Sequence, residues 1–163
     1  GESIIEMPFD MLHLAPPQTA PKFVKESPLV NDAGWLDVDK NTLQHNKFAN
    51  IFGLGDVAAL PTAKTGAAIR KQVPVVSDNI LQLIAHSKKG NKSYNGYSSC
   101  PLVTGYGKMI LAEFDYDNNF IPDPKLKQML VFNSEKEHWR LWMLKKYGLP
   151  YLYWNKMMKG KEV

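Results

Sequence analysis

Residues 50–57 read NIFGLGDV and carry the clearest structural signal of the chain. Apolar residues lead up to Gly55 and Asp56, and helical spacing begins near Thr65, so the stretch predicts a strand that ends in a turn before a helix. Gly55 would let a ligand approach the backbone, and the Asp56 carboxylate offers two acceptors for vicinal hydroxyl groups. The helix start would turn unpaired N–H groups toward an electron-rich group. A turn followed by a helix cap is the alternative interpretation.

Three further segments have regular patterns. Residues 64–86 have helical spacing, and Pro74 within them should kink or divide the helix. Residues 108–114 (KMILAEF) are typical of a strand, and residues 11–15 predict a buried strand that ends at two prolines. The polar residues 87–95 are the expected boundary between two parts of the chain.

Cys100 is the single cysteine of the chain, so the chain can form no internal disulfide and no cysteine-based zinc site. A lone cysteine is typically a small buried apolar residue, whereas a redox cysteine needs a second thiol, which this chain lacks. The four histidines lie on unrelated segments without ligand spacing, so we expect no metal site.

The positive charge is concentrated in residues 138–163, which contain six basic residues and one acid, whereas the whole chain has a net charge of +4. The same segment holds three of the four tryptophans, a mixture typical of helices that lie in a membrane interface. The alternative is a terminal helical hairpin docked on the protein's own core. Nothing matches a nucleic-acid reading element, so no nucleic-acid partner is expected. The residues expected at a membrane surface are Trp139, Trp142, Lys145, Lys146, Tyr151 and Trp154.

Residues 134–137 (SEKE) form a capping box, which predicts a helix that runs to Tyr147 and stops at Gly148. A second short helix over residues 151–159 would complete a hairpin. No run of apolar residues is long enough for a membrane-spanning helix. The chain starts at Gly1 in the middle of a pattern, so we expect it to be a piece of a longer protein.

Six segments together resemble the mitochondrial type of sulfide:quinone oxidoreductase, and the resemblance covers roughly the last two-fifths of that family. They are residues 37–39 (DVD), 42–45 (TLQH), 50–56 (NIFGLGD), 60–65 (LPTAKT), 97–106 (YSSCPLVTGY) and 150–155 (PYLYWN). The resemblance implies an α/β fold, α+β as a fragment: the carboxyl-terminal portion of a flavoprotein with two dinucleotide-binding domains, ending in an amphipathic helical hairpin. Residues 1–92 would carry the FAD Gly-Asp motif, 93–133 the redox cysteine and strands, and 134–163 the membrane-associating helices.

The same resemblance implies the chemistry. Cys100 would be one of two redox cysteines that relay sulfide sulfur as a persulfide to a small acceptor, with two electrons passing through FAD to ubiquinone at the inner mitochondrial membrane. Asp56 would bind the ribityl part of FAD. The residues expected at the cofactor are Gly55, Asp56, Lys64, Thr65, Gly66 and Ala67.

Two features of the family pattern are absent from the chain: the Gly-rich loop for the FAD pyrophosphate and the partner cysteine. We therefore expect this chain alone to be inactive and to need the amino-terminal remainder of the same protein. Two alternatives stay open: a type II NADH:quinone dehydrogenase-like flavoprotein, which shares the Gly-Asp motif without needing the cysteine, and a non-catalytic module for membrane binding or complex assembly.

Overall fold

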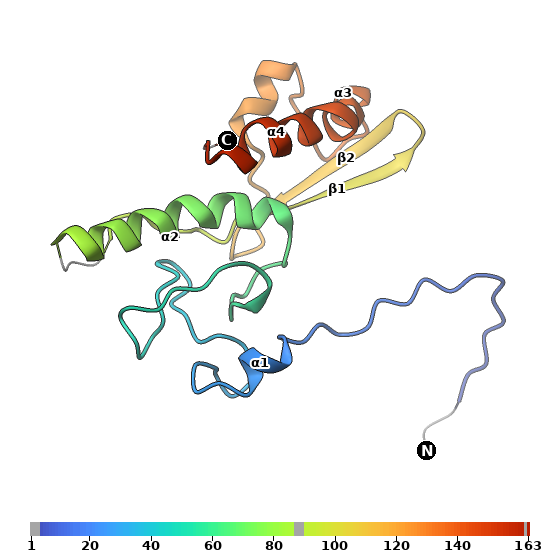
Figure 1. The fold of residues 1–163 in the computed structure, drawn as a ribbon. Coiled ribbons are helices and arrows are strands. Elements are labelled where there is room, and N and C mark those ends of the chain that lie inside the picture. Colours follow the sequence, from blue (N-terminus) through green and yellow to red (C-terminus); the bar gives the residue numbers. More distant parts are fainter. Residues whose placement is uncertain (1–3, 87–89, 162) are drawn as a thin grey trace.

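The computed structural model describes residues 4–86, 90–161 and 163, which form a small mixed helix and strand fold (Figure 1). The helices are α1 (Lys22–Lys25), α2 (Gly66–His86), α3 (Trp139–Met143) and α4 (Leu149–Asn155), and the strands are β1 (Ser98–Gly105) and β2 (Lys108–Phe114). Shorter helical turns are η1 (Gly55–Val57), η2 (Pro124–Met129), the π-helical η3 (Leu144–Gly148) and η4 (Met157–Lys159).

The long helix α2 confirms the helix predicted over residues 64–86. Pro74 lies inside it without dividing it. The strand predicted before it is reduced to an isolated bridge between Gln44 and Phe52, followed by the turn η1. Figure 1 shows α2 between the loops that contain η1 and the β1–β2 hairpin. The residues that α2 buries are Ala68, Gln72, Val75, Val76 and Asn79.

Strands β1 and β2 pair as an antiparallel hairpin, with β2 in the position predicted from the sequence. Ser98 pairs with Phe114 at one end, and Cys100 pairs with Ala112. The register shifts between Val103 and Gly105, close to the turn. Because side chains alternate across a strand, this register fixes which face of the hairpin each residue occupies.

Apolar residues gather in two cores. The first lies between α2 and the loops before it, and its fully buried members include Leu43 and Ala58. The second packs one face of β2 against η2 and α3, through Met109, Leu126 and Leu141. The hairpin and the terminal helices are thus held together by a core separate from the one that holds the Gly55–Val57 turn.

The strand predicted at residues 11–15 is absent. Residues 4–19 are exposed and extend away from the rest of the chain, and the side chain of Met11 is 89% exposed (Figure 1). A strand needs a neighbour to pair its backbone groups, and no described segment lies beside this one. The apolar run identifies residues that would be buried beside a sheet, but it does not supply that sheet.

The predicted terminal helical hairpin is also wrong. Residues 139–155 form one continuous helical run, because α3 passes through the π-turn η3 into α4 and Gly148 keeps ordinary helical angles. Pro150 stands in the first turn of α4, directly after the widened π-turn, where its missing N–H is tolerated.

The capping box before this run does not form. Ser134 and His138 are bound along β2 instead: Leu111 N–H donates to the Ser134 carbonyl at 2.8 Å, and His138 N–H donates to the Met109 carbonyl at 2.9 Å. The helix begins at Trp139, and its cap is the His138 ring nitrogen, which accepts from Arg140 N–H at 3.1 Å.

Candidate functional site

The Gly-Asp turn is fixed against the first turns of α2. Gly55 has a φ of +71°, a conformation that side-chain-bearing residues rarely adopt, and a Cβ placed there would meet Ile69 at 3.3 Å. Its N–H donates to the buried Gln72 side chain at 2.8 Å. The glycine is therefore required by the backbone geometry that places Asp56.

Asp56 and Lys64 lie near each other, but only the Lys64 side chain makes a hydrogen bond within the described residues. Asp56 is exposed, and no residue in the described part of the chain donates a hydrogen bond to its carboxylate. The Lys64 ammonium donates to the Ala58 carbonyl at 2.7 Å and lies 4.2 Å from the centre of the Trp35 ring. Burial lowers the pKa of Lys64, and the nearby Asp56 charge opposes that shift. Lys64 thus brings positive charge to the turn while its nitrogen contacts the fold itself.

The amino-terminal end of α2 is open. Thr65 caps it through its hydroxyl oxygen, which accepts from Ala68 N–H at 3.2 Å. Within the described residues the N–H groups of Gly66 and Ala67 have no acceptor, and a Cβ at Gly66 would meet nothing within 4 Å. An exposed carboxylate, free N–H groups and open space fit a ligand that has both hydroxyls and an electron-rich portion, such as the FAD implied by the resemblance.

Cys100 is exposed on β1, on the face of the hairpin turned away from the second core. Ala112 lies opposite it, and alternate residues on the same face are Leu102, Ile110 and Phe114. Leu102 and Phe114 are both exposed. The thiol therefore lies on an accessible apolar sheet face, a surface suited to contact with a flat ring.

A mostly buried polar cluster joins α2 to the hairpin. Tyr97 O–H donates to the Glu113 carboxylate at 2.6 Å, and Asp123 N–H donates to the same carboxylate at 3.2 Å. Arg70 of α2 lies 3.6 Å from the Asp123 carboxylate and 5.9 Å from the centre of the Tyr97 ring. Because Gln72 of the same helix holds Gly55, the Gly-Asp turn and the segment that begins β1 are anchored to the same turn of α2.

Burial, together with the Asp123 charge, raises the pKa of Glu113 against the opposing effects of the Tyr97 hydrogen bond and of Arg70. A carboxyl whose pKa is raised by folding is stabilising below its ordinary pKa, and that contribution is lost as pH rises through the folded value. As pH rises from the ordinary pKa of a glutamate to the higher pKa of Glu113 in the folded protein, we expect the wild type to lose free energy of unfolding relative to Glu113→Gln. The loss is about 1.4 kcal/mol for each tenfold difference in the proton affinity of Glu113 between the folded and unfolded protein. Urea unfolding at a series of pH values measures it; a wild type that gains relative stability instead would mean that Arg70 dominates.

The six residues expected at a membrane surface divide between two sides of the helical run. Trp142 packs against the second core and lies 5.3 Å from the Tyr106 ring, and Lys145 donates to the Pro101 carbonyl at 2.9 Å. Lys146 lies over the Trp142 ring at 4.7 Å. Trp139, Tyr151 and Trp154 are exposed, Lys145 and Lys146 are exposed as well, and Trp142 alone is half-buried.

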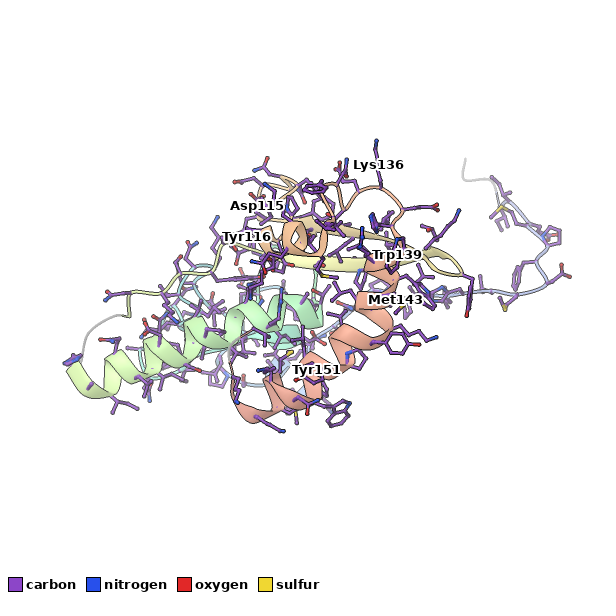
Figure 2. All side chains as sticks on the ribbon, turned by 90° about the horizontal axis from the view of Figure 1, so that it is seen from above. Asp115, Tyr116, Lys136, Trp139, Met143 and Tyr151 are labelled. Atoms are coloured by element: carbon purple, nitrogen blue, oxygen red, sulfur yellow. The ribbon has the colours of Figure 1, made fainter. Side chains whose placement is uncertain are left out.

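The exposed side carries an aromatic stripe, in which residues follow one another at intervals of three or four along the run. Figure 2 labels Trp139, Met143 and Tyr151 of this stripe. Such intervals keep side chains on one side of a helix, and the π-turn in the middle prevents the drift of an ordinary helix. Its members are Trp139, Met143, Tyr147, Tyr151 and Trp154.

Sequence reasoning missed the two residues that hold the site in place, Gln72 and Glu113. Gln72 occupies an apolar face of the predicted helix, and Glu113 alternates with Met109 and Leu111 on the buried face of the predicted strand. A polar residue at a core position indicates a buried hydrogen-bond partner, and that pattern was a usable signal.

Within residues 4–86, 90–161 and 163, no group of three or more histidine, cysteine, aspartate or glutamate side chains could hold a metal ion. No helix in the same part of the chain combines the length and apolar character needed to cross a membrane.

Comparison with curated proteins finds three relatives that share one name. The chain is 45% identical over 160 residues to the mitochondrial sulfide:quinone oxidoreductase of Mus musculus, and 41% identical over 171 residues to that of Dictyostelium discoideum. It is 42% identical over 154 residues to the enzyme of the same name from Schizosaccharomyces pombe. These matches cover 94–98% of this chain and 33–36% of the relatives, so the chain spans about a third of their length. No protein-family model matches the chain.

Among solved structures, one chain of a cryo-electron microscopy structure of the Tetrahymena thermophila mitochondrial ATP synthase, an F1Fo composite tetramer, is similar to this protein. It is 38% identical with a TM-score of 0.59, and the match covers 64% of this chain and 25% of that one. Over nearly its whole length the chain is therefore similar to mitochondrial sulfide:quinone oxidoreductases, and it corresponds to a carboxyl-terminal portion of these relatives.

Proposed function

We propose that this chain forms the cysteine-bearing, flavin-contacting part of a protein that oxidises sulfide and reduces a quinone. The observation that carries the proposal is the 41–45% identity to three sulfide:quinone oxidoreductases over nearly the whole chain. The geometry supports it in two places: an exposed acid beside an open helix start, and a lone exposed thiol on an apolar sheet face.

The first place is where the cofactor would bind. Asp56 would accept hydrogen bonds from ribityl hydroxyls of FAD, with Gly55 allowing the close approach. The N–H groups of Gly66 and Ala67, behind the Thr65 cap, would face the electron-rich portion of the flavin. Lys64 would add positive potential there without a direct bond, because its nitrogen is held by the Ala58 carbonyl.

The second place is where sulfur chemistry would occur. Cys100 would form a disulfide with a second cysteine that lies outside this chain, and a hydrosulfide ion would attack that disulfide. One sulfur–sulfur bond breaks and a persulfide bond forms, so the disulfide gains two electrons, the sulfide sulfur loses two, and one thiolate is released. A nucleophilic acceptor then takes the outer sulfur and leaves a second thiolate. A bound FAD supplies the two-electron relay from this thiol pair to the quinone.

The aromatic stripe supports the membrane part of the proposal. Trp and Tyr rings prefer the headgroup depth of a bilayer, and basic residues attract anionic lipid. The stripe would bring the protein to the lipid surface in which a hydrophobic quinone such as ubiquinone dissolves, consistent with a peripheral place on the inner mitochondrial membrane.

The proposed organisation follows the relatives. Residues 1–92 would complete dinucleotide-binding domains, residues 93–133 would carry the redox cysteine, and residues 134–163 would contact the membrane. The remainder of a protein of the relatives' length would provide the Gly-rich pyrophosphate loop and the second cysteine. Its docking would also cover the exposed apolar face around Cys100.

A second candidate is a non-catalytic subunit for complex assembly. The observation that favours it is the similar chain in the Tetrahymena thermophila mitochondrial ATP synthase structure, at 38% identity. Such a subunit would keep the fold and its surface contacts without any requirement for Cys100.

The test is to measure quinone reduction by the longer protein that contains this chain, with sulfide or with NADH as the electron donor. We expect sulfide, and not NADH, to drive quinone reduction in the presence of a sulfur acceptor, because the chemistry proposed for Cys100 consumes sulfide. NADH-driven turnover would support the type II dehydrogenase alternative. No turnover with either donor, in protein shown to contain FAD, would support the assembly subunit.

A further inference from the structure

Leu130 adopts a conformation that leucine rarely adopts. It ends η2 with a φ of +56° and a ψ of +33°, the left-handed region in which Gly and Asn are the usual residues. Its side chain is 55% exposed, so little packing in the described structure compensates for this strain. Strained residues of this kind concentrate at functional contacts.

Leu130 also borders the aromatic stripe. Together with Met129 it lines a shallow, mainly apolar groove of about 400 Å³ whose other wall is the start of α3, with Trp139 and Met143. Figure 2 places Trp139 and Met143 one after the other along the helical run that continues to Tyr151. The end of η2 is therefore continuous with the exposed apolar side of the terminal helices.

The charge around this surface is suited to an anionic partner. Residues 124–163 contain nine lysines and arginines against three glutamates. Arg140 lines the groove itself, and Lys127 lies in the last turn of η2. An apolar ridge flanked by basic residues matches the lipid tails and anionic headgroups of a bilayer surface.

We infer that Leu130 is a second membrane contact: the end of η2 inserts it into the interface of an anionic phospholipid bilayer beside Trp139 and Met143. The inference rests on the membrane part of the proposed function, and it adds an anchor outside the terminal helices. The left-handed backbone at Leu130 directs the side chain outward, and the groove beside it accommodates acyl-chain segments.

The test is Leu130→Asn, because Asn suits the left-handed backbone and removes the apolar side chain. Sedimentation with phosphatidylcholine vesicles containing phosphatidylglycerol should show roughly five- to tenfold weaker partitioning of this variant, with an unchanged or higher thermal unfolding midpoint. The matched control is Leu81→Gln, a 63% exposed leucine on α2, which should bind vesicles like the wild type.

Three results would overturn the inference. If Leu130→Asn binds like the wild type while Tyr151→Ser binds more weakly, Leu130 is no anchor and the membrane role of the stripe still stands. If neither substitution changes binding, the Leu130 anchor and the membrane role of the aromatic stripe both fail, while the proposed sulfide chemistry is judged by the electron-donor test alone. A lower unfolding midpoint for Leu130→Asn would assign Leu130 to packing instead.

Discussion

Replacing Cys100 by serine should abolish sulfide-dependent quinone reduction in the longer protein, with a loss of about a thousandfold or more. A serine cannot form the disulfide that sulfide attacks, and no other cysteine of this chain can replace it. FAD should remain bound, because Cys100 is exposed and distinct from the residues around Asp56. Steady-state quinone reduction and the flavin content of the purified variant measure the two parts.

The matched control is Thr104→Ala, an exposed residue on the same strand, which should keep most of the turnover. Retained activity in Cys100→Ser would count against the sulfide mechanism. Loss of FAD together with activity would instead assign Cys100 a structural role at the cofactor.

Replacing Asp56 by alanine should weaken FAD retention by roughly ten- to a hundredfold, the range expected when a hydrogen bond to a charged group is lost. The thermal unfolding of the cofactor-free protein should stay the same, because no described residue donates a hydrogen bond to this carboxylate. Fluorescence titration of the cofactor-free protein with FAD measures the affinity.

Asp32→Ala is the control for this change, since Asp32 is also an exposed acid. Asp56→Asn should retain part of the affinity through its carbonyl oxygen. If Asp56→Ala binds FAD as tightly as the wild type, the Gly-Asp turn has no cofactor role and the first half of the proposed site is refuted.

The sequence predicted the elements whose patterns are local. The apolar residues of α2 recur at helical spacing, and β2 combines β-favouring residues in a short run, so both were placed correctly. The resemblance carried by the Gly-Asp and Cys100 segments pointed to the same relatives that the comparison with known proteins found. Gly55 was expected to let a ligand approach, and that stays a prediction; its φ of +71° gives a separate, conformational reason for the glycine.

The failures have one physical cause, which is competition from tertiary contacts. Ser134 has the neighbours of a helix cap, but backbone hydrogen bonds to β2 hold residues 134–138 in a turn beside that strand, and the Ser134 hydroxyl is buried without a partner among the described residues. Gly148 and Pro150 read as a helix stop, yet the packing of Leu141 and Leu144 on the hairpin keeps the helix continuous through a π-turn. The exposed run at residues 11–15 needs a neighbouring strand that local sequence cannot provide.

The most direct test of the account is a structure of the longer protein with FAD bound. The proposed site predicts that an Asp56 oxygen accepts from the ribityl chain while the Cys100 sulfur, on the same molecule, lies within about 4 Å of the flavin ring or of the second cysteine. A structure in which the Cys100 sulfur faces solvent, far from both the flavin and any second cysteine, would contradict it.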